Sequence, residues 1–167
     1  MNKPHQFLPS ILMILSSIFS YAQNPTDTAK INFIKTQFAE INKNLKSYKR
    51  IEKTDTTETT ERNEVLLYYK GKDIKRITAT YYGETGKALQ EYYFFDKKLI
   101  FCYCIDYHYN MPFTVKGGGK IASTTEERFY LDNDKILMVK KRPTKSEYFS
   151  EFPTDPQKEA KRLMNLK

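Results

Sequence analysis

Hydrophobic and polar residues alternate with a period of two through most of the chain, from about residue 48 to residue 141. Side chains of a β-strand point alternately to opposite faces of a sheet, so this pattern predicts a succession of strands. The runs are rich in β-branched and aromatic residues, which favour strands. We expect strands at 46–54, 61–70, 74–82, 88–95, 99–109, 124–131 and 135–141.

Short polar segments separate these strands. They are rich in glycine, aspartate, asparagine and lysine, as turns typically are, and they lie at 71–73, 83–86, 96–98 and 132–134. A parallel return needs a crossover of about a dozen residues or more, so such short connections join antiparallel neighbours. The sequence therefore predicts an up-and-down antiparallel meander, although it leaves the register of the central hairpin open.

The segment before the strands has helical periodicity instead. Its apolar residues recur at spacings of three and four, and they are Ile31, Ile34, Phe38, Ile41 and Leu45. This predicts an amphipathic helix of about five turns, with Thr26 or Asp27 as its N-cap. We expect its apolar stripe to cover one face of the sheet. At the other end of the chain, Thr154-Asp155-Pro156 predicts the start of a short charged helix.

The predicted fold class is therefore α+β. An N-terminal amphipathic helix packs on a twisted antiparallel meander sheet of six or seven strands, and the C-terminal helix has a lesser part. We expect the face of the sheet opposite the N-terminal helix, lined by aromatic residues and by Asp106, His108 and Arg128, to be the binding surface.

The first residues have the composition of a secretory signal peptide. Lys3 precedes an apolar run at 7–19, and small residues Ser20 and Ala22 occupy the positions that a signal peptidase reads. The run is shorter than the roughly 20 apolar residues of a transmembrane helix. We therefore expect a signal peptide at 1–22, a single domain at 23–167, no integral membrane segment after cleavage, and a periplasmic or secreted location.

The charge of the chain fits this location. The formal net charge is +8 at pH 7, but its basic residues are scattered over turns and alternate strand positions. Dispersed charge of this kind keeps strand edges soluble. An exported chain has no nucleic acid as its partner, and a loose attraction to an anionic envelope surface remains an alternative.

Three hairpins share a plan of an apolar end, an acidic or glycine turn, a basic residue and an aliphatic restart: Tyr68–Ile74, Phe94–Ile100 and Tyr130–Ile136. The uneven spacing between them indicates repeated hairpin chemistry rather than a solenoid. With the leader and the single long helix, the motifs YYGETGK, YYFFDKKLI and ERFYLDNDKIL resemble small exported bacterial proteins of a Bacteroidota type. The resemblance covers most of the chain after residue 22. It implies a fold and a compartment and adds no activity.

The strand at 99–109 carries the residues with the most varied chemistry. Alternation predicts one face with Ile100, Cys102, Cys104, Asp106 and His108, and another with Leu99, Phe101, Tyr103, Ile105 and Tyr107. A zinc or copper site needs further ligands from a neighbouring strand. The chain after residue 22 has no other histidine or cysteine, so we expect no metal and no cofactor. We interpret the cysteines as buried reduced thiols, with a strained disulfide or a disulfide-linked dimer as alternatives.

Catalytic patterns are weak. A nucleophile needs a base, and His108 is the sole histidine after residue 22. The carboxylates near the central strands are Glu91, Asp106, Glu126 and Glu127. They leave a small carboxylate-dependent hydrolase as an alternative function.

Our leading hypothesis is an exported non-catalytic binding module of the cell envelope, with an envelope component or a protein as its partner. The chain has 13 tyrosines and no tryptophan, and tyrosine suits a half-wet gripping surface, although cross-strand pairing alone also explains them. The candidate ligand-binding residues are Tyr92, Tyr93, Asp106, His108 and Arg128. A structural or assembly protein of the envelope is a further alternative. The long segment 110–123 is expected to be a mobile loop over a binding surface.

Overall fold

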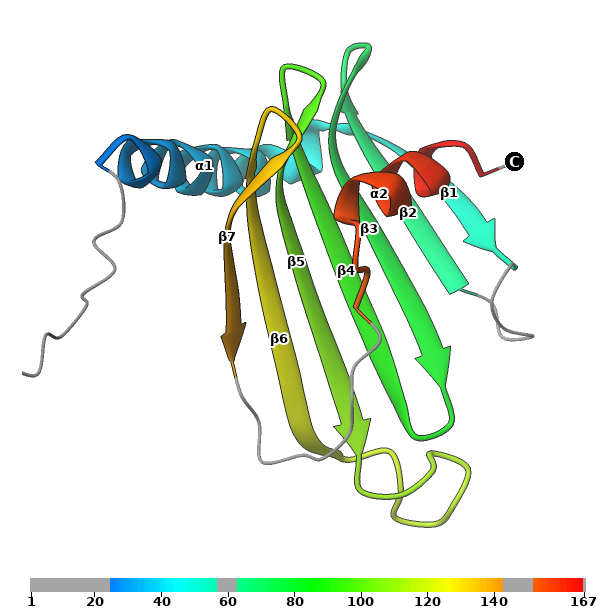
Figure 1. The fold of residues 1–167 in the computed structure, drawn as a ribbon. Helices are drawn as coiled ribbons and strands as arrows, with labels where there is room; N and C mark the ends of the chain where they lie inside the picture. The colour runs from blue at the N-terminus through cyan, green and yellow to red at the C-terminus, as the bar shows by residue number, and fades with distance from the viewer. Residues whose placement is uncertain (1–24, 57–62, 143–151, 167) are drawn as a thin grey trace, which may run out of the picture.

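The computed structural model describes residues 25–56, 63–142 and 152–166, so the predicted signal peptide at 1–22 lies outside the described residues (Figure 1). The helices are α1 (Pro25–Asn44) and α2 (Pro156–Met164), and a short 3₁₀ helix, η1 (Leu45–Ser47), follows α1. The strands are β1 (Lys49–Asp55), β2 (Asn63–Lys70), β3 (Asp73–Gly83), β4 (Gly86–Phe95), β5 (Lys98–Tyr109), β6 (Ile121–Asp132) and β7 (Lys135–Arg142).

The seven strands form one antiparallel sheet in which each strand pairs with its neighbours in sequence, in the order β1 to β7. This confirms the predicted α+β fold class and the meander. Two-residue turns with positive φ close two of the hairpins, at Asp96 and Lys97 (48° and 62°) and at Asn133 and Asp134 (47° and 66°). Such turns match the twist of the flanking strands. None of the described helices is both long and apolar enough to cross a bilayer.

The start of α1 differs slightly from the prediction. The helix begins at Pro25, so Thr26 and Asp27 lie in its first turn and neither is its N-cap. The fixed φ of proline suits the first helical position, which moves the start of the helix ahead of the two predicted caps.

Three hairpins carry one extra residue on their second strand, close to the turn. The extra residues are Lys75 in β3, Ile100 in β5 and Leu137 in β7. These are the three hairpins, Tyr68–Ile74, Phe94–Ile100 and Tyr130–Ile136, whose sequences follow the same order of residue types. A bulge breaks the alternation of side chains, so Ile100 lies on the same face as Phe101. The prediction that Ile100 shares a face with Cys102 is therefore wrong, and Leu99 takes its place there.

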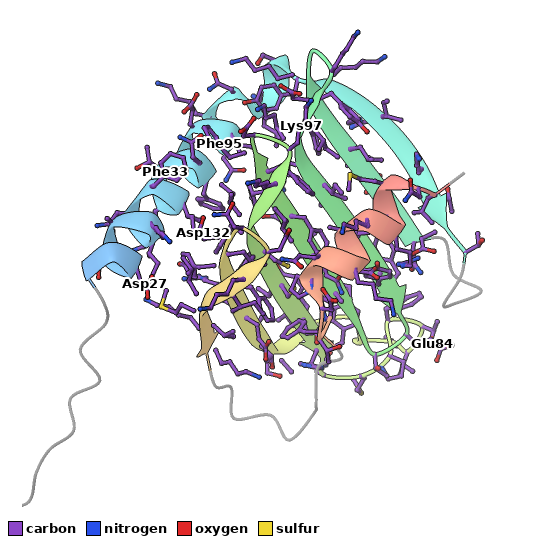
Figure 2. All side chains as sticks on the ribbon, turned by 45° about the horizontal axis from the view of Figure 1, so that its top comes forward. Asp27, Phe33, Glu84, Phe95, Lys97 and Asp132 are labelled. Carbon is purple, nitrogen blue, oxygen red and sulfur yellow. The ribbon has the colours of Figure 1, made fainter. Side chains whose placement is uncertain are left out.

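The two helices lie on opposite faces of the sheet, which we name the α1 face and the α2 face (Figure 1). On the α1 face, α1 crosses the strands near the turns that join β4 to β5 and β6 to β7. The core of this face consists of Ile31, Ile34, Ile41, Tyr93, Ile100, Phe101 and Tyr130. Figure 2 shows Phe33 of α1 against Phe95 at the end of β4, with the ring centroids 5.0 Å apart.

The α2 face was predicted to be open, and α2 covers part of it. Asp155 caps the helix, because its carboxylate accepts hydrogen bonds from the backbone amides of Gln157 (3.1 Å) and Lys158 (3.0 Å). Ala160 and Leu163 then pack into a core of β2 to β6 that combines aliphatic side chains and two cysteines with the rings of Tyr92, Phe94 and Phe129. The C-terminal helix thus has a larger structural part than its sequence suggested.

Candidate functional site

A pocket of about 450 Å³ lies between α1 and the strands β5 and β6, on the α1 face. Its lining residues are Ile34, Lys35, Phe38, Phe101, Tyr103, Arg128 and Tyr130. This volume falls within the usual range for small-molecule sites, and a mainly apolar lining with a few polar groups is typical of them. We name it the α1 pocket.

Cross-strand pairing builds the floor of the α1 pocket. Phe101 of β5 is directly opposite Tyr130 of β6, and Tyr103 is directly opposite Arg128. Residues two apart on a strand share a face, so both pairs point toward α1. The floor therefore depends on the register between β5 and β6.

The wall and floor of the pocket meet in an aromatic cluster. The ring of Phe101 lies 4.9 Å from that of Tyr130 and 5.4 Å from that of Phe38, measured between centroids. Phe38 also lies 4.9 Å from Tyr93, which is fully buried beneath the helix. Edge and tilted contacts of this kind stabilise aromatic pairs beyond the area that they bury, so the apolar end of the pocket is well fixed.

The polar end of the α1 pocket is positively charged. Arg128 lies over the ring of Tyr103, 5.3 Å from its centroid, and its Nη2 lies 3.0 Å from Glu126 Oε2. The Arg128 side chain is 38% exposed, and Lys35 is exposed on α1 above it. Among the described residues, the lining of the pocket includes two cations and no carboxylate. The pocket thus combines an apolar body with a cationic rim.

The hydroxyl group of Tyr103 is protonated near neutral pH. Burial of the ring and the nearby negative charge of Glu126 raise the pKa of Tyr103 above its ordinary value of 10.0, against the opposing effect of Arg128. A protonated hydroxyl is a hydrogen-bond donor, so Tyr103 adds a neutral donor beside the guanidinium.

A polar cluster holds α1 in place beside the pocket. Arg76 of β3 pairs with Glu91 of β4 and donates a 2.9 Å hydrogen bond to Asn42 of α1. The Tyr93 hydroxyl donates to Glu91 at 2.6 Å, and its oxygen lies 3.2 Å from the side-chain oxygen of Asn42. Burial, with Glu91 nearby, raises the pKa of Tyr93 far above its ordinary value. The helix is therefore anchored by directional bonds and not only by its apolar stripe.

A second hollow, of about 270 Å³, lies at the opposite end of β5, around the turn between β3 and β4. Asp106 and His108 line it together with Tyr81, Tyr82, Lys87 and Tyr107. Gly86 allows the strands to approach here, because a Cβ atom at this position would lie 2.4 Å from the carbonyl oxygen of Tyr107. This hollow is smaller and shallower than the α1 pocket, and its lining combines tyrosine rings with charged side chains.

The five predicted site residues are spread over separate places. Tyr92 is buried in the core of the α2 face, where its hydroxyl donates to Gln90 Oε1 at 2.6 Å. Tyr93 is buried in the core of the α1 face. Asp106 and His108 lie together in the second hollow, and Arg128 lies in the α1 pocket. The structure therefore brings together only Asp106 and His108.

Three of the four carboxylates considered for hydrolysis lie beside a cation, and the fourth, Asp106, lies with His108 in the second hollow. Glu91 pairs with Arg76 and Glu126 with Arg128, and Glu127 lies 2.7 Å from Lys141. Within the described ranges, no group of three or more His, Cys, Asp or Glu side chains is arranged to hold a metal ion.

Cys102 and Cys104 are free thiols, buried in the core of the α2 face with their sulfur atoms 3.5 Å apart. Burial, together with the hydrogen bond to Cys104, raises the pKa of Cys102 well above 9.0. A protonated thiol is a poor nucleophile, so Cys102 behaves as a packing residue in the state that the structure describes.

The sequence alone did not indicate the α1 pocket. The helical stripe pointed to Ile34 and Phe38 as cover for the sheet, and Lys35 as part of the solvated side. Only the register between β5 and β6 shows that Arg128 meets Tyr103 under the helix. No family model, no curated protein and no solved structure matches the chain.

Proposed function

We propose that the chain is an exported, non-catalytic binding module of the cell envelope, and that the α1 pocket takes a small amphipathic anion. One observation carries the proposal: an aromatic floor ends at Arg128, with Lys35 above it, and no carboxylate lines the space in the described residues. Arginine is suited to carboxylate and phosphate groups because its guanidinium presents five donors in a planar fork. The apolar part of the ligand would lie against Phe38, Phe101 and Tyr130.

Export rests on the signal-peptide pattern at 1–22, and the absence of turnover rests on the lining of the pocket. Phenylalanine, tyrosine, isoleucine and two cations supply recognition, but they include no general base that titrates near neutral pH. The hydrolase alternative has weaker support, since Glu91, Glu126 and Glu127 each face a cation, and Asp106 lies with His108 in the smaller and shallower second hollow. An assembly protein that pairs through its sheet edge is disfavoured by Lys140 and Lys141 on β7, because lysines on an edge strand oppose pairing.

The binding test uses anilinonaphthalene sulfonate, a fluorescent probe with an aromatic body and one anionic group. We expect it to bind the folded protein and to bind Arg128→Gln more weakly by a factor on the order of ten, as loss of a hydrogen bond to a charged group implies. Arg50→Gln is the matched control. Arg50 also faces a carboxylate two positions away on its own strand, Glu52 at 3.4 Å, but it lies on β1, away from the pocket.

Equal affinity for the probe in the Arg128→Gln and Arg50→Gln variants would refute the pocket. Far-UV circular dichroism of both variants ensures that the probe reports binding and not unfolding. Native mass spectrometry of the protein from its own source then addresses the natural ligand. A bound mass that denaturation releases chemically unchanged supports a binding module, whereas release of a converted product would contradict it.

A further inference from the structure

The connection between β5 and β6, residues 110–120, differs from every other described turn. The other described turns have polar tips, namely Gly71-Lys72, Glu84-Thr85, Asp96-Lys97 and Asn133-Asp134. This loop instead exposes Met111 (42%), Phe113 (56%) and Val115 (48%), and Ile121 (56%) follows at the start of β6. These four side chains, which we name the apolar tip, are exposed to solvent.

Backbone bonds hold the loop in this form. Asn110 closes its base, because its amide donates to the Lys120 carbonyl (2.9 Å) and its side-chain oxygen accepts from the Lys120 amide (3.0 Å). Within the loop, Gly118 donates to Val115 at 2.8 Å, and Phe113 donates to Glu84 of the neighbouring turn at 3.0 Å. These bonds hold the backbone of the loop, while Met111, Phe113 and Val115 stay about half exposed. The expected mobility of the loop stays a prediction.

A glycine in the loop is required by a close approach of the backbone. A Cβ atom at Gly118 would lie 1.9 Å from the carbonyl oxygen of Pro112, far inside contact distance. The chain therefore folds tightly on itself here. This tight fold, in which Phe113 also lies close to Gly119, leaves the side chains of the apolar tip on the exposed surface of the loop.

The charge of the loop has a single sign. Lys116 and Lys120 are both exposed, and the segment from residue 107 to residue 125 has no aspartate or glutamate. Figure 1 shows the loop projecting beyond the end of the sheet, and Figure 2 shows the neighbouring Glu84 at the end of the sheet opposite Lys97. Six strand residues, or about 20 Å, separate Tyr103 in the α1 pocket from Tyr109 at the base of the loop.

We infer that this loop docks on an anionic lipid surface. The apolar tip enters the interfacial region of the bilayer, and Lys116 and Lys120 contact the anionic headgroups, a combination that stabilises binding at a membrane surface. A lipid surface fits better than a protein partner, because a convex apolar tip needs a complementary hollow on a protein but none in a fluid bilayer. This inference is independent of the α1 pocket.

The absence of tryptophan from the chain makes a direct test simple. Phe113→Trp places a single fluorescent reporter in the loop, and Phe33→Trp places one on α1, at a residue of similar exposure (44%). We name these two the loop reporter and the helix reporter. The assays use the protein as it is purified from cells, and a measurement of its intact mass defines its N-terminus. Each variant is mixed with vesicles of phosphatidylcholine alone or of phosphatidylcholine with phosphatidylglycerol.

We expect the emission of the loop reporter to shift to shorter wavelength with the phosphatidylglycerol vesicles, while that of the helix reporter stays unchanged. In co-sedimentation, Phe113→Ser lowers partitioning by a factor on the order of ten, and Phe33→Ser leaves it unaltered. Lys116→Gln and Lys120→Gln each lower it about fivefold, and added salt removes this difference.

Three results would overturn the inference. One is an unchanged emission spectrum of the loop reporter with both kinds of vesicle. Another is an equal shift of both reporters, which indicates that another part of the chain, or unfolding, causes binding. The third is a shift of the loop reporter that grows with protein concentration in the absence of vesicles, which identifies a second copy of the chain as the cover.

Discussion

Each face of the sheet is covered by one helix, but the two interfaces are built differently. On the α1 face, large aromatic rings meet the helix and a pocket remains open beside Arg128. On the α2 face, aliphatic side chains and the two cysteines lie with the rings of Tyr92 and Phe129 in a core beneath Leu163, and a hollow of about 430 Å³ borders the start of α2. The helices themselves differ: Phe38 of α1 contributes a ring that leaves space beside it, whereas Ala160 and Leu163 of α2 allow a close approach.

The means of attachment differ as well. The α1 helix has 20 residues and a long apolar stripe, so several contacts share its attachment. The α2 helix has nine residues, which is too short for independent stability in water. It is held at its C-terminal end, where Arg162 lies 2.7 Å from the fully buried Asp55 and Lys53 donates to the carbonyl of Met164 at 3.1 Å. The α2 helix is thus attached to its face of the sheet through a few specific contacts, and the α1 helix through many.

The largest expected effect is therefore on the α2 face. Arg162→Gln removes the guanidinium that faces Asp55 and also bonds to Glu159. We expect a loss of about 3 kcal/mol in the free energy of unfolding at neutral pH, because a buried carboxylate loses its cation. Urea denaturation followed by far-UV circular dichroism measures it. The double variant Asp55→Asn, Arg162→Gln should recover part of the loss, and a single variant as stable as the wild type would contradict the argument.

Alkaline pH tests both faces at once. Burial is the main cause that raises the pKa of Tyr92 on the α2 face, and of Tyr93 on the α1 face, well above 10.0. Between 10.0 and the folded pKa, the folded protein holds a proton that the unfolded chain has released. Each tyrosine therefore contributes its full stabilisation of the folded protein below pH 10. As pH rises above 10, the free energy of unfolding falls by about 1.4 kcal/mol per pH unit for each tyrosine.

Unfolding free energies across this pH range, with the tyrosinate absorbance recorded in parallel, measure the effect. The variants Tyr92→Phe and Tyr93→Phe each remove one tyrosine from the titration, so they show how much of the pH-dependent loss each face contributes. A stability profile that stays level well above pH 10 would show that neither ring is buried as described.

The same two variants sharpen the comparison at neutral pH. Tyr93 donates to the carboxylate of Glu91, and Tyr92 donates to the neutral amide oxygen of Gln90, both at 2.6 Å. A hydrogen bond to a charged group contributes about 1.5–3 kcal/mol, and a neutral one about 1 kcal/mol. We therefore expect Tyr93→Phe to be more destabilising than Tyr92→Phe in urea denaturation. The reverse order would show that the polar cluster at Arg76 does not need the Tyr93 hydroxyl.

Sequence periodicity was sufficient for the elements and their order. Each predicted strand was found with its ends within three residues, because strand periodicity and turn composition are local signals. The bulges were not predictable, since one extra residue such as Ile100 leaves no mark in composition yet moves a side chain to the other face. The α1 pocket needs the pairing of Tyr103 with Arg128, and the closure by α2 needs Asp55 to meet Arg162 across 107 positions. Neither contact is local.

The smallest expected effect is on the α1 face, where the same variants distinguish a role of Arg128 in binding from a role in stability. Arg128 and Arg50 make the same kind of pair with a carboxylate two positions away, at 3.0 Å and 3.4 Å. The Arg50 side chain is 58% exposed, and solvent screening makes such a pair nearly neutral, so Arg50→Gln should leave stability unchanged within about 0.5 kcal/mol.

Arg128→Gln should lower stability by only about 1 kcal/mol, because Arg128 also lies over the Tyr103 ring. Tyr103→Leu removes the ring, so combining it with Arg128→Gln in a double-mutant cycle isolates the ring contact in urea denaturation. A loss of several kcal/mol for Arg128→Gln would identify Arg128 as a structural residue. A small loss of stability together with weaker binding of the probe would identify Arg128 as a ligand-binding residue.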